Sequence, residues 1–155
     1  MANDPAGSTW KKWDLHVHTP SSVVHNYPGA NQDDAWEAFL QDLESLPPEF
    51  KAIGINDYIF IDGYARARKA KLEQGRLRNI DLLLPVIELR LDKFAGVVKK
   101  EKDGTYSQSG WNRINLHVIF DAMDPEVIQQ QFLNSLTPSY QLIPDSSDWG
   151  GKRKG

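Results

Sequence analysis

The sequence predicts an α/β fold in which parallel strands alternate with flanking helices. Apolar segments of strand length recur four times along the chain, and helical segments separate most of them. Strands separated by helices favour a parallel sheet with right-handed crossovers. The chain has 155 residues, of which 40% are apolar, and this size suits one domain rather than two.

Four segments rich in Ile, Leu and Val are the expected strands. They lie at residues 13–18, 52–57, 82–89 and 114–120. Each is short, apolar and β-prone, as strands buried in an α/β sheet are.

Three segments are the expected helices. The first covers 34–46, where apolar residues recur at helical spacing until a pair of prolines ends the pattern. The second covers 63–72 and consists of good helix formers. The third begins after Asp124, which offers an N-cap and is followed by a proline suited to the first helical position.

The remaining segments divide the chain into a domain and two flanks. Residues 1–9 are expected to form a flexible leader, and residues 138–155 an irregular tail or the start of a missing region. Within the domain, 10–137, the polar stretch 93–110 is expected to form a hairpin or a mobile loop. The predicted elements make roughly half of a closed barrel, which typically needs about 250 residues. The expected fold is therefore a partial or truncated barrel, completed by missing sequence or by a partner.

Composition excludes several classes of protein. The chain has no cysteine, which rules out disulfides and thiolate metal sites, and its net charge is only −3. Its longest apolar run, 82–87, contains a proline and is far shorter than the roughly 20 residues that a membrane span needs. No secretory signal is recognisable at the start. We therefore expect a cytoplasmic protein with no membrane partner.

Ionisable residues stand inside the first expected strand. Asp14, His16 and His18 alternate with apolar residues, so a period of two points all three side chains to one face. Two imidazoles at this spacing can bind the same cation, and Asp14 is expected to orient one of them. His25 follows in the first loop.

Other ionisable residues stand in the later strands. Asp57 ends the second, Glu88 lies near the end of the third, and His117 lies within the fourth. Catalytic groups in parallel α/β sheets collect at the C-terminal ends of strands, so these residues are expected to meet the histidines of the first strand. A lone strand histidine is more often a hydrogen-bonded structural residue. So many ionisable groups buried together would, however, be costly without a cation.

The residue types indicate which metals and which chemistry the site would favour. Imidazole and carboxylate ligands without sulfur suit Zn²⁺, Mn²⁺ or Fe²⁺. If Glu88 bridged two such ions, they would activate a water and neutralise a phosphoryl oxygen. Arg90 lies two residues after Glu88, so in a continuing strand it would face the same side and could bind a phosphate. The alternative is an ordinary exposed arginine.

Four sequence motifs resemble successive motifs of the PHP (polymerase and histidinol phosphatase) family. They read DLHVHTP, IGINDY, LLPVIELR and NLHVIF, and they span about 10–121. The lead-in GSTWKKWDLHVHTP resembles more narrowly the N-terminal PHP domains of proteins that also carry an SMC- or AAA-like ATPase.

The PHP resemblance implies a distorted seven-stranded (β/α) barrel, a cluster of two or three divalent metal ions, and phosphoester hydrolysis. The second motif usually reads Asp-His in the family, and here it reads Asp57-Tyr58. The family's later motifs, including a final Asp-x-His, have no counterpart in this sequence. The residues that match the family's metal ligands are His16, His18, His25, Glu88 and His117, with Asp57 as a further ligand or proton acceptor.

Three functions are therefore considered. The leading one is a metal-dependent phosphoesterase, a phosphatase or nuclease acting on nucleic acid or nucleotides, in which Asp57, His117 and Arg90 act on the substrate. The second is a catalytically inactive regulatory or assembly module of an ATPase, which could act in defence against foreign DNA. The third is an amidohydrolase-like C–N hydrolase, a class that also begins with two histidines on a strand.

The expected partners follow from these functions. They are a phosphorylated small molecule or a nucleic acid, an ATPase domain or subunit, and a possible second copy of the chain. The segment 64–78 carries a net charge of +5 and could track a nucleic-acid backbone, although a solvated helix face is the favoured interpretation.

Overall fold

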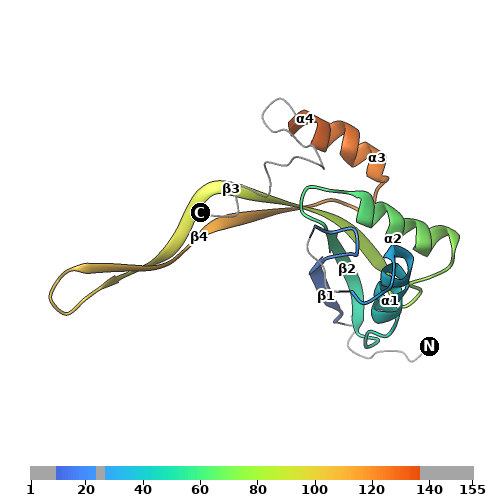
Figure 1. Ribbon diagram of the computed structural model, residues 1–155, viewed down its shortest axis with the longest axis horizontal. Helices are drawn as coiled ribbons and strands as arrows, with labels where there is room; N and C mark the ends of the chain where they lie inside the picture. Colours follow the sequence, from blue (N-terminus) through green and yellow to red (C-terminus); the bar gives the residue numbers. More distant parts are fainter. Residues whose placement is uncertain (1–9, 24–26, 137–155) are drawn as a thin grey trace.

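The computed structural model describes residues 10–23 and 27–136 (Figure 1). The expected leader, the expected tail and His25 lie outside the described residues. The described chain is a mixed α/β fold with one four-stranded sheet, in the order β1-β2-β3-β4. Its elements are β1 (Lys12–Val17), α1 (Gln32–Glu44), β2 (Phe50–Asn56), α2 (Asp62–Glu73), β3 (Leu82–Lys100), β4 (Tyr106–Ile119), α3 (Pro125–Ile128), η1 (Gln129–Leu133) and α4 (Asn134–Leu136).

Local sequence signals account for the starts of α1 and α3. The side chain of Asn31 caps α1 by accepting hydrogen bonds from the backbone N–H groups of Asp33 and Asp34. Asp124 caps α3 in the same way, with Pro125 at the start of the helix. The third expected helix is confirmed, although one turn of it, η1, is a π-helix.

One expectation about the sheet is wrong. β1 and β2, and β2 and β3, pair in parallel as predicted, but β4 pairs antiparallel to β3. The reason is the short connection at residues 101–105, since a parallel crossover needs a dozen or more residues. Gly104, with φ of +87°, allows the tight turn, and its N–H donates to the carbonyl of Glu101.

The polar stretch 93–110 is therefore a hairpin, one of the two alternatives expected. It lengthens the third and fourth strands well beyond their predicted limits. In Figure 1 this part of β3 and β4 projects away from the rest of the molecule as a two-stranded ribbon.

The apolar core lies between the sheet and its helices. Tyr64 of α2 packs there, and its hydroxyl donates to the carbonyl of Met123 at 2.9 Å, which ties α2 to the segment before α3. The largest fully buried apolar side chains are Trp36, Phe39, Ile53, Ile55, Tyr64, Leu77, Ile80, Ile87, Ile128 and Leu133.

Among the described residues, no helix has both the length and the apolar character needed to cross a membrane.

Candidate metal centre

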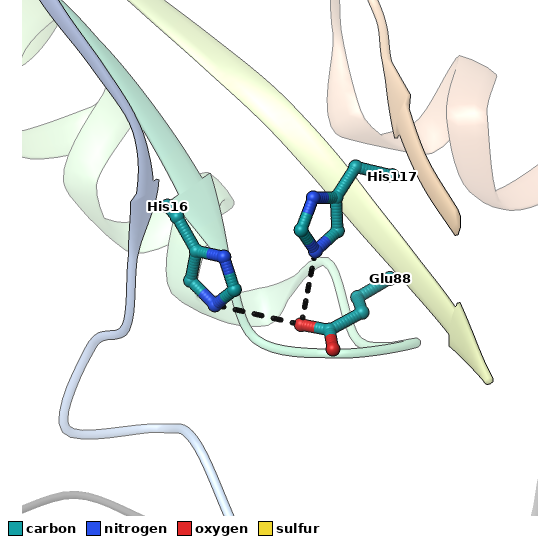
Figure 2. A group of neighbouring side chains, drawn as sticks. All are labelled: His16, Glu88 and His117. Atoms are coloured by element: carbon teal, nitrogen blue, oxygen red, sulfur yellow. Dashed lines mark ion pairs between the residues drawn. The ribbon is translucent and has the colours of Figure 1, made fainter. Parts of the chain in front are cut away.

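Three side chains from three strands converge on one point. The Oε2 atom of Glu88 on β3 lies 3.6 Å from Nε2 of His16 on β1 and 3.4 Å from Nε2 of His117 on β4. One ligand atom from each residue lies within 4.8 Å of the other two. Figure 2 shows both imidazoles directed at the same carboxylate. Two nitrogens and one oxygen in this arrangement are a donor set that suits a divalent transition metal.

The antiparallel ladder explains how Glu88 and His117 meet. The two residues are direct partners across β3 and β4. Residues directly opposite each other in a ladder project from the same face, with their Cβ atoms close together. The reversed direction of β4 therefore still brings His117 to the face of the sheet that carries Glu88.

A register shift in β1 brings His16 to that face. Asp14 pairs with Ile53 and Val17 pairs with Ile55, so β1 advances by three residues where β2 advances by two. The extra residue reverses the alternation of side chains, as a bulge does. Asp14 and His16 therefore face opposite sides, and the expectation that they share one face is wrong. Asp14 Oδ1 instead accepts a hydrogen bond from the backbone N–H of His16 at 3.1 Å.

Gly54 of β2 provides the space for this irregularity. A Cβ atom at Gly54 would lie 2.8 Å from Cα of Leu15 and 2.9 Å from its carbonyl oxygen. Any larger residue would therefore push apart the backbones of β1 and β2 at the point that positions His16.

Two asparagines hold the central carboxylate. Asn56 of β2 is fully buried, and its Nδ2 donates to Oε2 of Glu88 at 2.9 Å. Asn115 of β4 donates to the other oxygen, Oε1. Sequence reasoning missed both residues. The available signals were a polar residue inside the apolar second strand and an asparagine with the strand parity of His117.

His18 adjoins the group of three without belonging to it. Its Nε2 lies 3.2 Å from Nε2 of His16, and its Nδ1 lies 3.4 Å from Oγ of Ser22. Its ring centroid is 5.0 Å from that of Tyr58. His18, one residue beyond the end of β1, thus places a ring nitrogen next to that of His16.

Asp57 takes a different place from the one expected. Its side chain is buried, Oδ1 accepts from the backbone N–H of Thr19 at 2.8 Å, and Oδ2 accepts from Oγ1 of Thr19 at 2.6 Å. Burial raises the pKa of Asp57, and the two hydrogen bonds from Thr19 oppose that rise. The structure therefore places Asp57 outside the group formed by His16, Glu88 and His117.

The first turn of α2 encloses the Asp57 carboxylate. A Cβ atom at Gly63 would lie 1.7 Å from Oδ2 of Asp57 and 2.4 Å from Oγ1 of Thr19. The glycine lets α2 approach this pair closely. Asp57 consequently connects α2 to the segment that follows His18.

Arg90 is exposed and lies on β3 two residues beyond Glu88. It pairs with Asn115, just as Glu88 pairs with His117, so Arg90 and Glu88 belong to the same face. Within 10–23 and 27–136, no carboxylate forms an ion pair with Arg90. Its guanidinium is therefore available beside the centre.

Comparisons with known proteins find no relative of this chain. No family model matches the sequence, and neither a curated protein nor a solved structure is detectably similar to the chain.

Proposed function

We propose that this chain is a metal-dependent hydrolase of phosphoester bonds, with its metal held by His16, Glu88 and His117. The supporting observation is the convergence of three ligand atoms from three strands around a carboxylate that is only 6% exposed. The resemblance of the four motifs to the PHP family supports the choice of phosphoesters. It also supports a barrel-type fold, of which the described sheet would be one part.

The contact distances fit a cation better than a set of direct hydrogen bonds. The separations of 3.4 and 3.6 Å between Glu88 and the two histidines exceed those of good hydrogen bonds. The three atoms instead surround a common point. Zn²⁺, Mn²⁺ and Fe²⁺ are the ions that this donor set favours.

The residues around the centre have distinct roles in this proposal. Asn56 and Asn115 orient the Glu88 carboxylate, and His18 supplies a further nitrogen beside His16. Arg90 binds a non-bridging phosphate oxygen of the substrate. A divalent cation bound there would supply Lewis acidity, lowering the pKa of a water and stabilising negative charge on phosphorus oxygens.

Metal content and hydrolysis measured together test the proposal. The purified chain is expected to bind a transition metal and to cleave bis(p-nitrophenyl) phosphate in its presence. The double variant His16→Ala, His117→Ala should lose both properties. The control Gln108→Ala, Asn112→Ala truncates two exposed side chains of β4 and should keep both. Equal metal content in wild type and the histidine variant would refute the metal centre.

A metal-binding regulatory module without hydrolysis is the second candidate, and the position of Asp57 favours it. Asp57 bonds to Thr19, and a tyrosine follows it where the family has a histidine. In the part of the chain that the structure describes, one group of three metal-ligating residues is found, not the two or three sites that the family resemblance implies. Tight metal binding without phosphodiester cleavage would support this module, which would then serve an attached ATPase. Cleavage of an N-acyl amide would support the C–N hydrolase instead.

A further inference from the structure

β3 and β4 continue past the candidate centre as a two-stranded arm, defined here as residues 90–116 (Figure 1). Every residue from 92 to 116 is exposed. The arm contains six Lys and Arg residues and three Asp and Glu residues, a net charge of +3 in a chain whose total is −3. The remainder of the chain therefore carries a net charge of −6, although its segment 64–78 is itself basic, with a net charge of +5.

The cations of the arm have no carboxylate partners among the described residues. Two of the three acids, by contrast, are engaged in the turn. Glu101 accepts a hydrogen bond from Ser107, and Asp103 accepts from the backbone and hydroxyl of Thr105. Arg113 lies over the ring of Phe94, 5.5 Å from its centroid, and no carboxylate of the described residues neutralises the cations of the arm, so they can meet an external anion.

The basic segment 64–78 differs in this respect. Arg66 bonds to Asp33 at 2.7 Å, and Arg76 bonds to two glutamates of α1 at 2.8–3.1 Å. Lys71 donates to two backbone carbonyls. The cations of segment 64–78 are therefore largely engaged in contacts within the fold, and the arm is the better surface for a polyanion.

Exposed aromatic rings accompany the charges of the arm. Phe94, Tyr106 and Trp111 are 52%, 66% and 47% exposed. A Cβ atom at Gly96 would lie 2.9 Å from Cδ2 of Trp111, so the indole rests closely on the Gly96 backbone. Cations close in sequence to exposed aromatic rings are the combination that binds single strands, by phosphate contacts and base stacking.

We propose that the arm binds single-stranded nucleic acid and leads it towards the candidate centre. The same two strands carry Glu88 and His117 at their inner ends and the cations and rings further out, with Arg90 between them. Strand binding is independent of the proposed hydrolysis, whereas delivery of a phosphodiester to His16, Glu88 and His117 rests on it.

Fluorescence anisotropy of the full chain with labelled oligo(dT) tests strand binding. The oligonucleotide is about 16 nucleotides long, which is the upper limit of the length that one single-strand-binding module typically covers. EDTA is present throughout, so the result does not depend on metal or activity. We compare Lys99→Gln, Lys100→Gln on the arm with Lys12→Gln, Lys69→Gln elsewhere, because both pairs remove the same charge. Thermal melting verifies that both variants are folded.

The arm variant is expected to bind about ten-fold more weakly than the control at low salt. Its slope of log K against log salt should be about 1.4 smaller in magnitude, since each lost phosphate contact removes about 0.7. Equal affinity in the two variants, or no binding by wild type at low salt, would overturn the proposal.

A second pair of variants separates stacking from charge. Trp111→Leu should weaken binding at least about five-fold, the lower bound for loss of one stacked base, whereas Trp111→Phe should restore most of it. Equal binding by Trp111→Leu and wild type, or a duplex of the same length binding as tightly as the strand, would refute the single-strand assignment. Strand binding without any hydrolysis would support strand binding by the arm, and it would refute the proposed enzyme together with delivery to the candidate centre.

Discussion

The buried amide of Asn56 donates a 2.9 Å hydrogen bond to Oε2 of Glu88, the oxygen that also faces His16 and His117. The other end of the same amide, Oδ1, accepts from the backbone N–H of Tyr58 at 3.2 Å. Because the carbonyl end is engaged by an N–H donor, the amide nitrogen must face Glu88. The turn after β2 therefore sets the orientation of the central carboxylate.

Asn56→Ala is expected to weaken metal binding by about 10–100-fold, the usual cost of losing a group that orients a ligand. The measurement is competition of the purified chain with a chromophoric chelator. Asn112→Ala, an exposed asparagine on β4, is the control and should bind as wild type does. If Asn56→Ala also kept its full affinity, the proposed orienting role would be wrong.

Glu88→Gln and Asp57→Asn are expected to differ in metal stoichiometry. Glu88→Gln removes the carboxylate at the point of convergence, so the ion should be lost. Asp57→Asn alters a carboxylate that bonds to Thr19, so the ion at His16, Glu88 and His117 should remain. Elemental analysis of both variants after equal dialysis gives the comparison. Loss of that ion from Asp57→Asn would show that Asp57 is a ligand after all.

Gly63→Ala is expected to destabilise the fold by about 1–3 kcal/mol, through overpacking against the Asp57 carboxylate. The sign is informative because replacing glycine by alanine within a helix normally stabilises it, by up to about 1 kcal/mol. Urea unfolding followed by circular dichroism measures the change. An increase in the free energy of unfolding would mean that α2 does not pack on Asp57 as described.

Glu44 should contribute to the acid sensitivity of the fold. Hydrogen bonds from Arg76, and a smaller contribution from the backbone N–H of Leu77, lower its pKa from the usual 4.5, while burial opposes them. A folded-state pKa below the unfolded value adds stability above about pH 4.5, and this stability is lost as the pH falls through the folded-state value.

Glu44→Gln is accordingly expected to cost about 1 kcal/mol at neutral pH, after allowance for solvent screening. Its stability should then fall less steeply than that of wild type at acid pH. Urea midpoints measured across the acid range test this, with Glu73→Gln as the control because Glu73 forms only an exposed ion pair at 4.0 Å. Parallel pH profiles for wild type and Glu44→Gln would contradict the assignment.

The inner part of the fold could be predicted from the chain because its signals are local. β1, β2, α1 and α2 all lie within one or two residues of their expected limits. For the outer halves of β3 and β4, the sequence left a hairpin and a mobile loop as alternatives, and it did not predict where the strands end. They are polar and exposed, and ladder hydrogen bonds hold them without the apolar pattern by which a buried strand is recognised.

The sequence by itself pointed to His16, Glu88 and His117, the three residues that the structure brings together, from their types and their places in β-prone segments. It pointed equally to His18 and Asp57, which lie outside that group. Only the tertiary structure decided how the three residues meet. It reversed the direction of β4, introduced the register shift before His16, and placed Asn56 rather than Asp57 against Glu88. Side-chain type and local preference depend on near neighbours in the chain. Strand direction and register depend on turns and ladder bonds between distant segments, and a shift of one residue moves a side chain to the other face.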